Sequence, residues 1–159
     1  TYTDNFDADI SGWDTSSVTN MESMFYVSNN FNGDISTWDT SSVTDMRYVF
    51  YLAGNFDTDI SGWDTSSVID MSFMFYSADS FDVDISSWDT SSVTTMRYMF
   101  SGAPFNQDIS SWDVSSVSDM SFMFYNSNDL SDDNKCAIHS SFDSNDNWPY
   151  DWDEYCSDE

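Results

Sequence analysis

The sequence predicts an α/β repeat protein: a right-handed parallel solenoid of the leucine-rich-repeat type, with five coils of about 25 residues and a C-terminal cap. Three observations lead to this prediction. The same bulky residues return at a fixed spacing, two hydrophobic periods alternate inside each repeat, and the repetition is lost near the C-terminal end. Because one short coil cannot bury its own apolar face, its stability must come from stacking on its neighbours.

The repeat reads F-(D/N)-x-D-I-S-x-W-D-(T/V)-S-S-V-x-x-M-x-x-(M/V)-F and starts near residues 6, 31, 56, 81 and 105. Four columns of apolar residues recur in it, and we expect them to line one continuous core. They are Ile10/35/60/85/109, Trp13/38/63/88/112, Met21/46/71/96/120 and Phe25/50/75/100/124.

Each repeat is expected to contain one short strand and one helical turn. Asp9-Ile10-Ser11-Gly12-Trp13 combines β-branched and aromatic residues, which favours an extended strand. Val18, Met21, Met24 and Phe25 have the spacing of one helical face. The intervening Asp-Thr-Ser-Ser suits a helix start or a turn.

The sequence divides into a solenoid of five repeats, residues 1–126, and a capping segment, residues 127–159. The single deletion falls in 101–104, where Gly and Pro indicate a surface turn that tolerates a change of length. Residues 130–142 read as one amphipathic helix, and an atypical terminal unit usually covers the open end of a repeat stack.

Composition excludes several classes of partner. The 159 residues include 29 Asp and Glu but only 3 Lys and Arg, which gives a net charge of −26. This charge argues against nucleic acid and against an anionic membrane surface. No apolar run is long enough for membrane insertion. Such a charge with few aliphatic residues often means disorder, but 13 Phe, 9 Tyr, 9 Met and 7 Trp supply a core.

The two cysteines lie close together near the C-terminal end. Cys136 and Cys156 fit a local disulfide in an oxidising compartment, the alternative being two buried free thiols. No basic, apolar signal segment opens the chain, which is therefore either a mature protein or a piece of a longer one. We expect an extracellular or cell-surface location.

The repeat resembles the surface-protein repeats of the BspA-like leucine-rich family, also called DUF285. Residues 105–125, FNQDISSWDVSSVSDMSFMFY, carry the resemblance most closely, and the segment after the repeats is also similar. The resemblance implies a microbial cell-surface protein, often linked to adhesion. It implies no enzymatic activity, no defined ligand and no catalytic residues to carry over.

Two columns of aspartates run along the repeats, Asp9/34/59/84/108 and Asp14/39/64/89/113. Stacking would bring like charges together, which hydrogen bonds or cations must offset. One interpretation is that each Asp accepts backbone N–H bonds in its own turn. The other is that Ca²⁺ bridges adjacent repeats through Asp9, Asp34, Asp59, Asp84 and Asp108. No cofactor is required. For the threonine column Thr15/40/65/90, turn chemistry is favoured over an ice-binding ladder.

Two aromatic columns are the candidate contact surface: Tyr26, Tyr51, Tyr76 and Tyr125, and Tyr48, Phe73, Tyr98 and Phe122. The buried Phe column already fills the core, so these rings should remain partly exposed and could stack on a carbohydrate or a protein. The alternative is that they simply pack on one another from repeat to repeat.

These features favour a non-enzymatic extracellular binding or adhesion module, whose partner is a protein or a carbohydrate at a surface. The runner-up is a structural subunit that self-associates end to end into a filament. Only five residues precede the first repeat, so Phe6, Ile10 and Trp13 would form an uncapped assembly end. An enzyme is the least favoured reading, because nearly identical repeats give no carboxylate pair a distinct environment.

Overall fold

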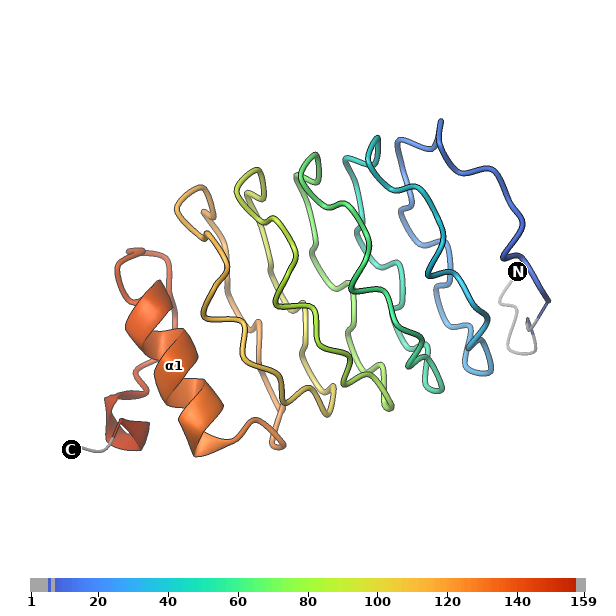
Figure 1. Ribbon diagram of the computed structural model, residues 1–159. Coiled ribbons are helices and arrows are strands. Elements are labelled where there is room, and N and C mark those ends of the chain that lie inside the picture. Colours follow the sequence, from blue (N-terminus) through green and yellow to red (C-terminus); the bar gives the residue numbers. More distant parts are fainter. Residues whose placement is uncertain (1–5, 7, 157–159) are drawn as a thin grey trace.

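The repeats lie side by side in one stack, and the segment after residue 126 covers its C-terminal edge (Figure 1). The structure is a computed structural model that describes residues 6 and 8–156. Successive repeats meet at four isolated parallel bridges: Asn20–Asp45, Asp45–Asp70, Asp70–Thr95 and Thr95–Asp119.

The predicted fold class, an α/β solenoid of the leucine-rich-repeat type, is wrong. Between residues 8 and 126 the chain forms neither a helix nor a strand longer than a single bridge. The segment expected as a strand turns back on itself, since the Trp13 N–H donates to the Ile10 carbonyl at 3.1 Å. The segment expected as a helix includes Ser23 at φ 59°, and Val27 just after that segment has φ 56°. Residues with positive φ do not fit a right-handed helix.

The segment that was expected to be helical is instead a run of tight turns, and hydrogen bonds join it to the next repeat. The N–H groups of Met46, Tyr48, Phe50 and Leu52 donate to carbonyls of residues 70, 72, 74 and 76 at 2.8–3.1 Å. Between them, the Tyr51 N–H donates locally to Tyr48 and that of Ala53 to Phe50. Backbone donors therefore alternate between local turns and the following repeat, which satisfies buried polar groups without a regular sheet.

The core follows the predicted columns. The Ile, Met and Phe columns are buried, and the Trp column is buried from Trp38 onward. The indole N–H groups of Trp38, Trp63, Trp88 and Trp112 donate to the carbonyls of Ile10, Ile35, Ile60 and Ile85 in the preceding repeat at 3.1–3.2 Å. Each buried indole therefore packs and also ties two repeats together.

The capping segment contains α1, Asp132–Phe142, and the 3₁₀ helix η1, Asp153–Tyr155. The helix expected in residues 130–142 is confirmed. The Ser131 side chain accepts the Asn134 N–H at its start, and Asp132 and Asp133 lie in the first turn, where acidic groups are favourable. The side chains of Ile138 and Phe142 are buried.

Polar side chains of the capping segment meet the backbone groups that the last repeat leaves open. The Asn145 amide donates to the carbonyls of Val114 and Val117 at 2.7 and 2.9 Å. The Phe124 N–H, which would otherwise donate to a further repeat, reaches the Tyr150 hydroxyl at 2.7 Å. Burial raises the pKa of Tyr150 to about 12, so this phenol stays protonated.

Candidate contact surface

The two aromatic columns form a surface strip, here called the aromatic strip and made of Tyr26, Tyr48, Tyr51, Phe73, Tyr76, Tyr98, Phe122 and Tyr125. Ser101 interrupts the tyrosine column between Tyr76 and Tyr125. The rings of Tyr26, Tyr51 and Tyr76 stack at 4.8 Å, and those of Tyr48, Phe73, Tyr98 and Phe122 at 4.7–4.9 Å. Edge-on contacts such as that of Tyr48 with Tyr51 at 5.7 Å join the columns. Both expected features are present, because the rings pack on one another and stay partly exposed.

Stacking decides which part of each ring a partner can reach. Tyr51, Phe73 and Tyr98 each stack between two rings, so they present mainly their edges to a partner. Phe122 and Tyr125, which end the two columns, are 45% and 53% exposed. A partner that needs an open ring face finds it at this end, whereas a partner that follows the whole strip meets ring edges.

The backbone under the strip is held in an unusual conformation. Tyr48, Phe73, Tyr98 and Phe122 all have φ between 55° and 59°. For bulky side chains this region costs about 1–3 kcal/mol per residue. The ladder of tight turns and the ring stacking hold these residues there. Burial, followed by the neighbouring Tyr26, Tyr76 and Tyr48, raises the pKa of Tyr51.

Acidic and basic side chains line one side of the strip. Arg47 contacts Asp45 through its Nε and Nη2 atoms at 2.7–3.1 Å, and its Nη2 lies 3.1 Å from Glu22. Burial alone would raise the pKa of Asp45, but the hydrogen bonds from Arg47 outweigh burial and lower it. Arg97 lies over the Tyr98 ring at 5.2 Å and 3.7 Å from Asp119.

The aspartate columns act as turn caps. Asp14 Oδ1 accepts the Ser16 hydroxyl at 2.7 Å and its N–H at 3.2 Å, and the pattern recurs at Asp39, Asp64 and Asp89. In the other column, the aspartates accept the N–H two residues on: Asp9, Asp34, Asp59, Asp84 and Asp108. Hydrogen bonds from Ser11 and Ser16 lower the pKa values of Asp9 and Asp14.

The structure brings the predicted calcium ligands together in pairs. Asp59 and Asp84 line one shallow groove, and Asp84 and Asp108 line the next. Their serine contacts explain how each turn tolerates its charge, so the grooves need no cation to account for the local geometry. Calcium binding there stays a prediction.

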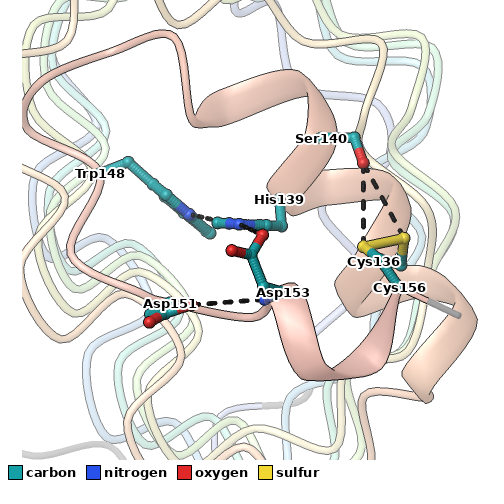
Figure 2. The surroundings of a disulfide bond; sticks show 7 residues. All are labelled: Cys136, His139, Ser140, Trp148, Asp151, Asp153 and Cys156. Carbon is teal, nitrogen blue, oxygen red and sulfur yellow. Dashed lines mark hydrogen bonds and ion pairs between the residues drawn. A yellow bond between two sulfur atoms is a disulfide. The ribbon is translucent and has the colours of Figure 1, made fainter. Parts of the chain in front are cut away.

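A second acidic cluster lies in the capping segment, next to the disulfide that joins Cys136 to Cys156 (Figure 2). His139, Asp151 and Asp153 have potential ligand atoms within 4.8 Å of one another. However, the Trp148 indole donates to His139 Nδ1 at 3.0 Å, and Nε2 lies 3.0 Å from Asp153. Nδ1 is therefore the acceptor and the Nε2–H donates, so the geometry fits a structural contact rather than a metal ligand.

The predicted assembly end is only partly open. Phe6 packs on Phe25 and Phe31 with ring centroids 6.3 and 5.6 Å apart, and Ile10 is buried. Trp13 is 58% exposed, although its ring stacks on Trp38. The exposed part of this candidate surface is therefore essentially one indole.

Sequence reasoning found the columns of the strip but missed how their surroundings are used. Arg47 and Arg97 pair with nearby Asp, and Arg97 also contacts the Tyr98 ring, which the sequence analysis did not predict. Arg97 and Tyr98 are neighbours in the sequence, and this adjacency could have predicted their contact. No local signal pointed to the His139–Trp148–Asp153 contacts, because folding of the capping segment brings these residues together.

Comparison with known families gives a match along most of the chain. A family model described as Mycoplasma protein of unknown function, DUF285, matches residues 1–104 and again residues 59–148. The chain belongs to this family. A DUF285 model that covers several similar repeats can fit the chain in two overlapping places. The resemblance to DUF285 is thereby confirmed, and the BspA-like name stays a prediction.

The comparisons with curated proteins and with solved structures gave no match. Across residues 6 and 8–156, none of the helices combines the length and apolar character needed to cross a bilayer.

Proposed function

We propose that this DUF285 protein is a non-enzymatic extracellular binding module that adheres to a surface through its aromatic strip. The observation that carries the proposal is the strip itself, two ordered aromatic columns that stay partly exposed along the stack. Exposed aromatic patches that are continuous over several repeats are typical of contact surfaces.

Backbone conformation adds support. Small or flexible residues would adopt positive φ at lower cost, yet four of the five repeats carry Tyr or Phe at the first positive-φ position. The first repeat carries Ser23 at this position. Placing large rings at an unfavourable backbone position is expected where the rings serve recognition.

Two further features support a binding role outside the cell. The disulfide between Cys136 and Cys156 fits an oxidising compartment. The aspartates of the two columns share nearly the same turn environment, so none of these columns offers the pair of distinct surroundings that acid–base catalysis needs.

A cell-binding assay with two matched variants tests the proposal. Phe122→Ser with Tyr125→Ser removes two rings that are about half exposed, so the fold should be little affected. Trp13→Ser removes an equally exposed ring at the opposite end of the stack. We expect the labelled double variant to lose most of its adhesion to host cells or matrix. The Trp13→Ser variant should adhere about as well as the parent protein. The reverse result would place the contact at the N-terminal edge.

End-to-end assembly is the second candidate function, and the exposure of Trp13 is the observation that favours it. A head-to-tail contact needs a second open face, and the capping segment covers the C-terminal edge in the described structure (Figure 1). The geometry therefore favours the strip. Light scattering over a concentration series would support assembly if the mass grew and Trp13→Ser abolished that growth.

A further inference from the structure

One repeat position beside the aromatic strip alternates between arginine and other residues. It is occupied by Glu22, Arg47, Ser72, Arg97 and Ser121 in the five repeats. Arg97 contacts both a ring and a carboxylate, because it lies over Tyr98 and near Asp119. Arg47 binds the carboxylates of Asp45 and Glu22. Arg97 therefore shows how a guanidinium group at this position combines a carboxylate with a ring of the strip.

The same surroundings recur where the arginine is replaced by serine. In the third repeat, Asp70 Oδ1 accepts the Ser72 N–H at 2.8 Å, and Oδ2 is 3.9 Å from the nearest guanidinium nitrogen, Arg47 Nε. The Asp70 side chain is 27% exposed. The neighbouring ring is Phe73, which stacks between Tyr48 and Tyr98.

The last repeat offers a second position of this kind. Asp119 Oδ1 accepts the N–H and hydroxyl of Ser121, and Oδ2 is 3.7 Å from Arg97. Phe122, the adjacent ring, is 45% exposed. A carboxylate oxygen beside an aromatic ring suits a planar guanidinium group, which can hydrogen-bond the carboxylate and contact the ring. At Phe122 that contact can use the exposed part of the ring, whereas at Phe73 it is limited to the ring edge.

We propose that the positions at Ser72 and Ser121 bind arginine side chains of a partner polypeptide, which lies along the aromatic strip. This inference rests on the proposed function of the strip and names its partner. Charge complementarity selects the occupant, since the chain has 29 acidic residues against 3 basic ones, and two of those basic residues already lie beside the strip.

The spacing of the two positions indicates the shape of the partner. They lie two repeats apart, about 10 Å at the spacing of stacked chains. A polyproline II segment rises about 3.1 Å per residue and completes a turn in three residues. Arginines at every third residue of such a segment would therefore face the strip at about the required distance.

The experiment measures fluorescence anisotropy of a labelled peptide in which arginine recurs every third residue between prolines, in about 0.15 M salt. A lysine peptide of the same length and charge is the first control. We expect the arginine peptide to bind about tenfold more tightly, because lysine is a strongly hydrated point charge that cannot form the bidentate contact.

Matched protein variants separate a specific site from general charge attraction. Ser72→Arg with Ser121→Arg supplies the guanidinium groups from the chain itself. This double variant should bind the arginine peptide about tenfold more weakly. Ser87→Arg with Ser111→Arg adds the same charge away from the strip, at exposed serines, and should weaken peptide binding about twofold at most. Arginine already occupies the 47 and 97 positions, so the first pair should fold, and Asp70→Asn provides an independent test that adds no side-chain volume.

Equal effects of the two double variants, or equal affinity of the arginine and lysine peptides, would overturn the inference. A different pattern would leave the proposed function standing. If Phe122→Ser with Tyr125→Ser abolishes cell binding but the arginine peptide does not bind, the strip is a contact surface for another partner. Competition of cell binding by free saccharide, but not by the arginine peptide, would point to a carbohydrate.

Discussion

The two edges of the repeat stack differ in how fully their polar groups are hydrogen-bonded and their apolar side chains are buried. At the C-terminal edge, Asn145 and Tyr150 meet open backbone groups of the last repeat, and the buried side chains of α1 cover its core. At the N-terminal edge, Trp13 is largely exposed and the Thr15 hydroxyl is buried without a hydrogen-bond partner. The same repeat position therefore contributes differently to the free energy of unfolding at the two edges.

The threonine column shows how the sequence changes at the C-terminal edge. The hydroxyls of Thr40, Thr65 and Thr90 donate to carbonyls in the following repeat at 2.9–3.0 Å. The last repeat, which is followed by the capping segment, has Val114 at this position. Exchanging a hydroxyl for a methyl group where the next carbonyl is missing avoids an unpaired buried donor.

The largest expected effect compares two tryptophans of one column. Trp63→Ala should lower the free energy of unfolding by about 3–5 kcal/mol, because it empties a buried site and removes the hydrogen bond to Ile35. Trp13→Ala should cost less than about 1 kcal/mol, since its ring is mostly in water. Urea unfolding of both variants measures the difference, and equal costs would contradict the unequal burial.

Removing the disulfide should have the next largest effect. Cys136→Ser with Cys156→Ser opens a loop of sequence separation 20 and should cost about 3 kcal/mol in the chain-entropy picture. Amide exchange should speed up in α1 and the last repeat more than at the N-terminal edge. Uniform exchange changes along the stack would show that the cap does not act locally.

A smaller effect separates two threonines that occupy the same repeat position. Thr65→Val removes a buried hydrogen bond to Asp89 and should cost about 1 kcal/mol. Thr15→Val removes a hydroxyl that has no partner and should be neutral or slightly stabilising. Thermal unfolding of both variants is a sufficient measurement. Similar losses would show that Thr15 does form a bond in solution.

The smallest effect is on pH dependence. The serine contacts lower the folded pKa values of Asp14, Asp39 and Asp89 below those of the unfolded chain. The ionised turns therefore stabilise the fold above the unfolded pKa, near pH 4, and this contribution is lost as pH falls through the lower folded values. Urea midpoints in high salt, which screens the net charge of −26, should fall on acidification. Rising midpoints would contradict the lowered pKa values.

Burial was predictable from the sequence because it depends on spacing. The Ile, Met and Phe columns lie inside at every repeat, and Trp13 is the one member of the four columns that is exposed. Local structure was not predictable in the same way. A run of tight turns places Met21 and Phe25 on the inside as well as a helix would, so the same spacing is compatible with both.

A sequence signal for a left-handed residue just after the expected helix lay in a column that the sequence analysis passed over. Val27, Leu52, Ser77, Gly102 and Asn126 all have positive φ. Gly and Asn adopt that conformation readily, whereas Val and Leu do not, so only two repeats carried the signal. At Gly102 an added Cβ would also lie 2.9 Å from the Ser77 hydroxyl. The membership of the aromatic strip was predictable, but the covering of its ring faces depends on stacking geometry.

The hydrogen bonds between repeats recur in the same pattern at each interior boundary, and this has a consequence for how such a chain can change in length. Every interior repeat donates to its successor through one set of groups and to its predecessor through another, and both sets recur from repeat to repeat. Copying one whole unit into the middle of the array would therefore leave both termini chemically unaltered. Each duplication would lengthen the array by about 4.8 Å and extend both aromatic columns by one position. Gene duplication could thus scale the reach and multivalency of the surface without redesigning its fold.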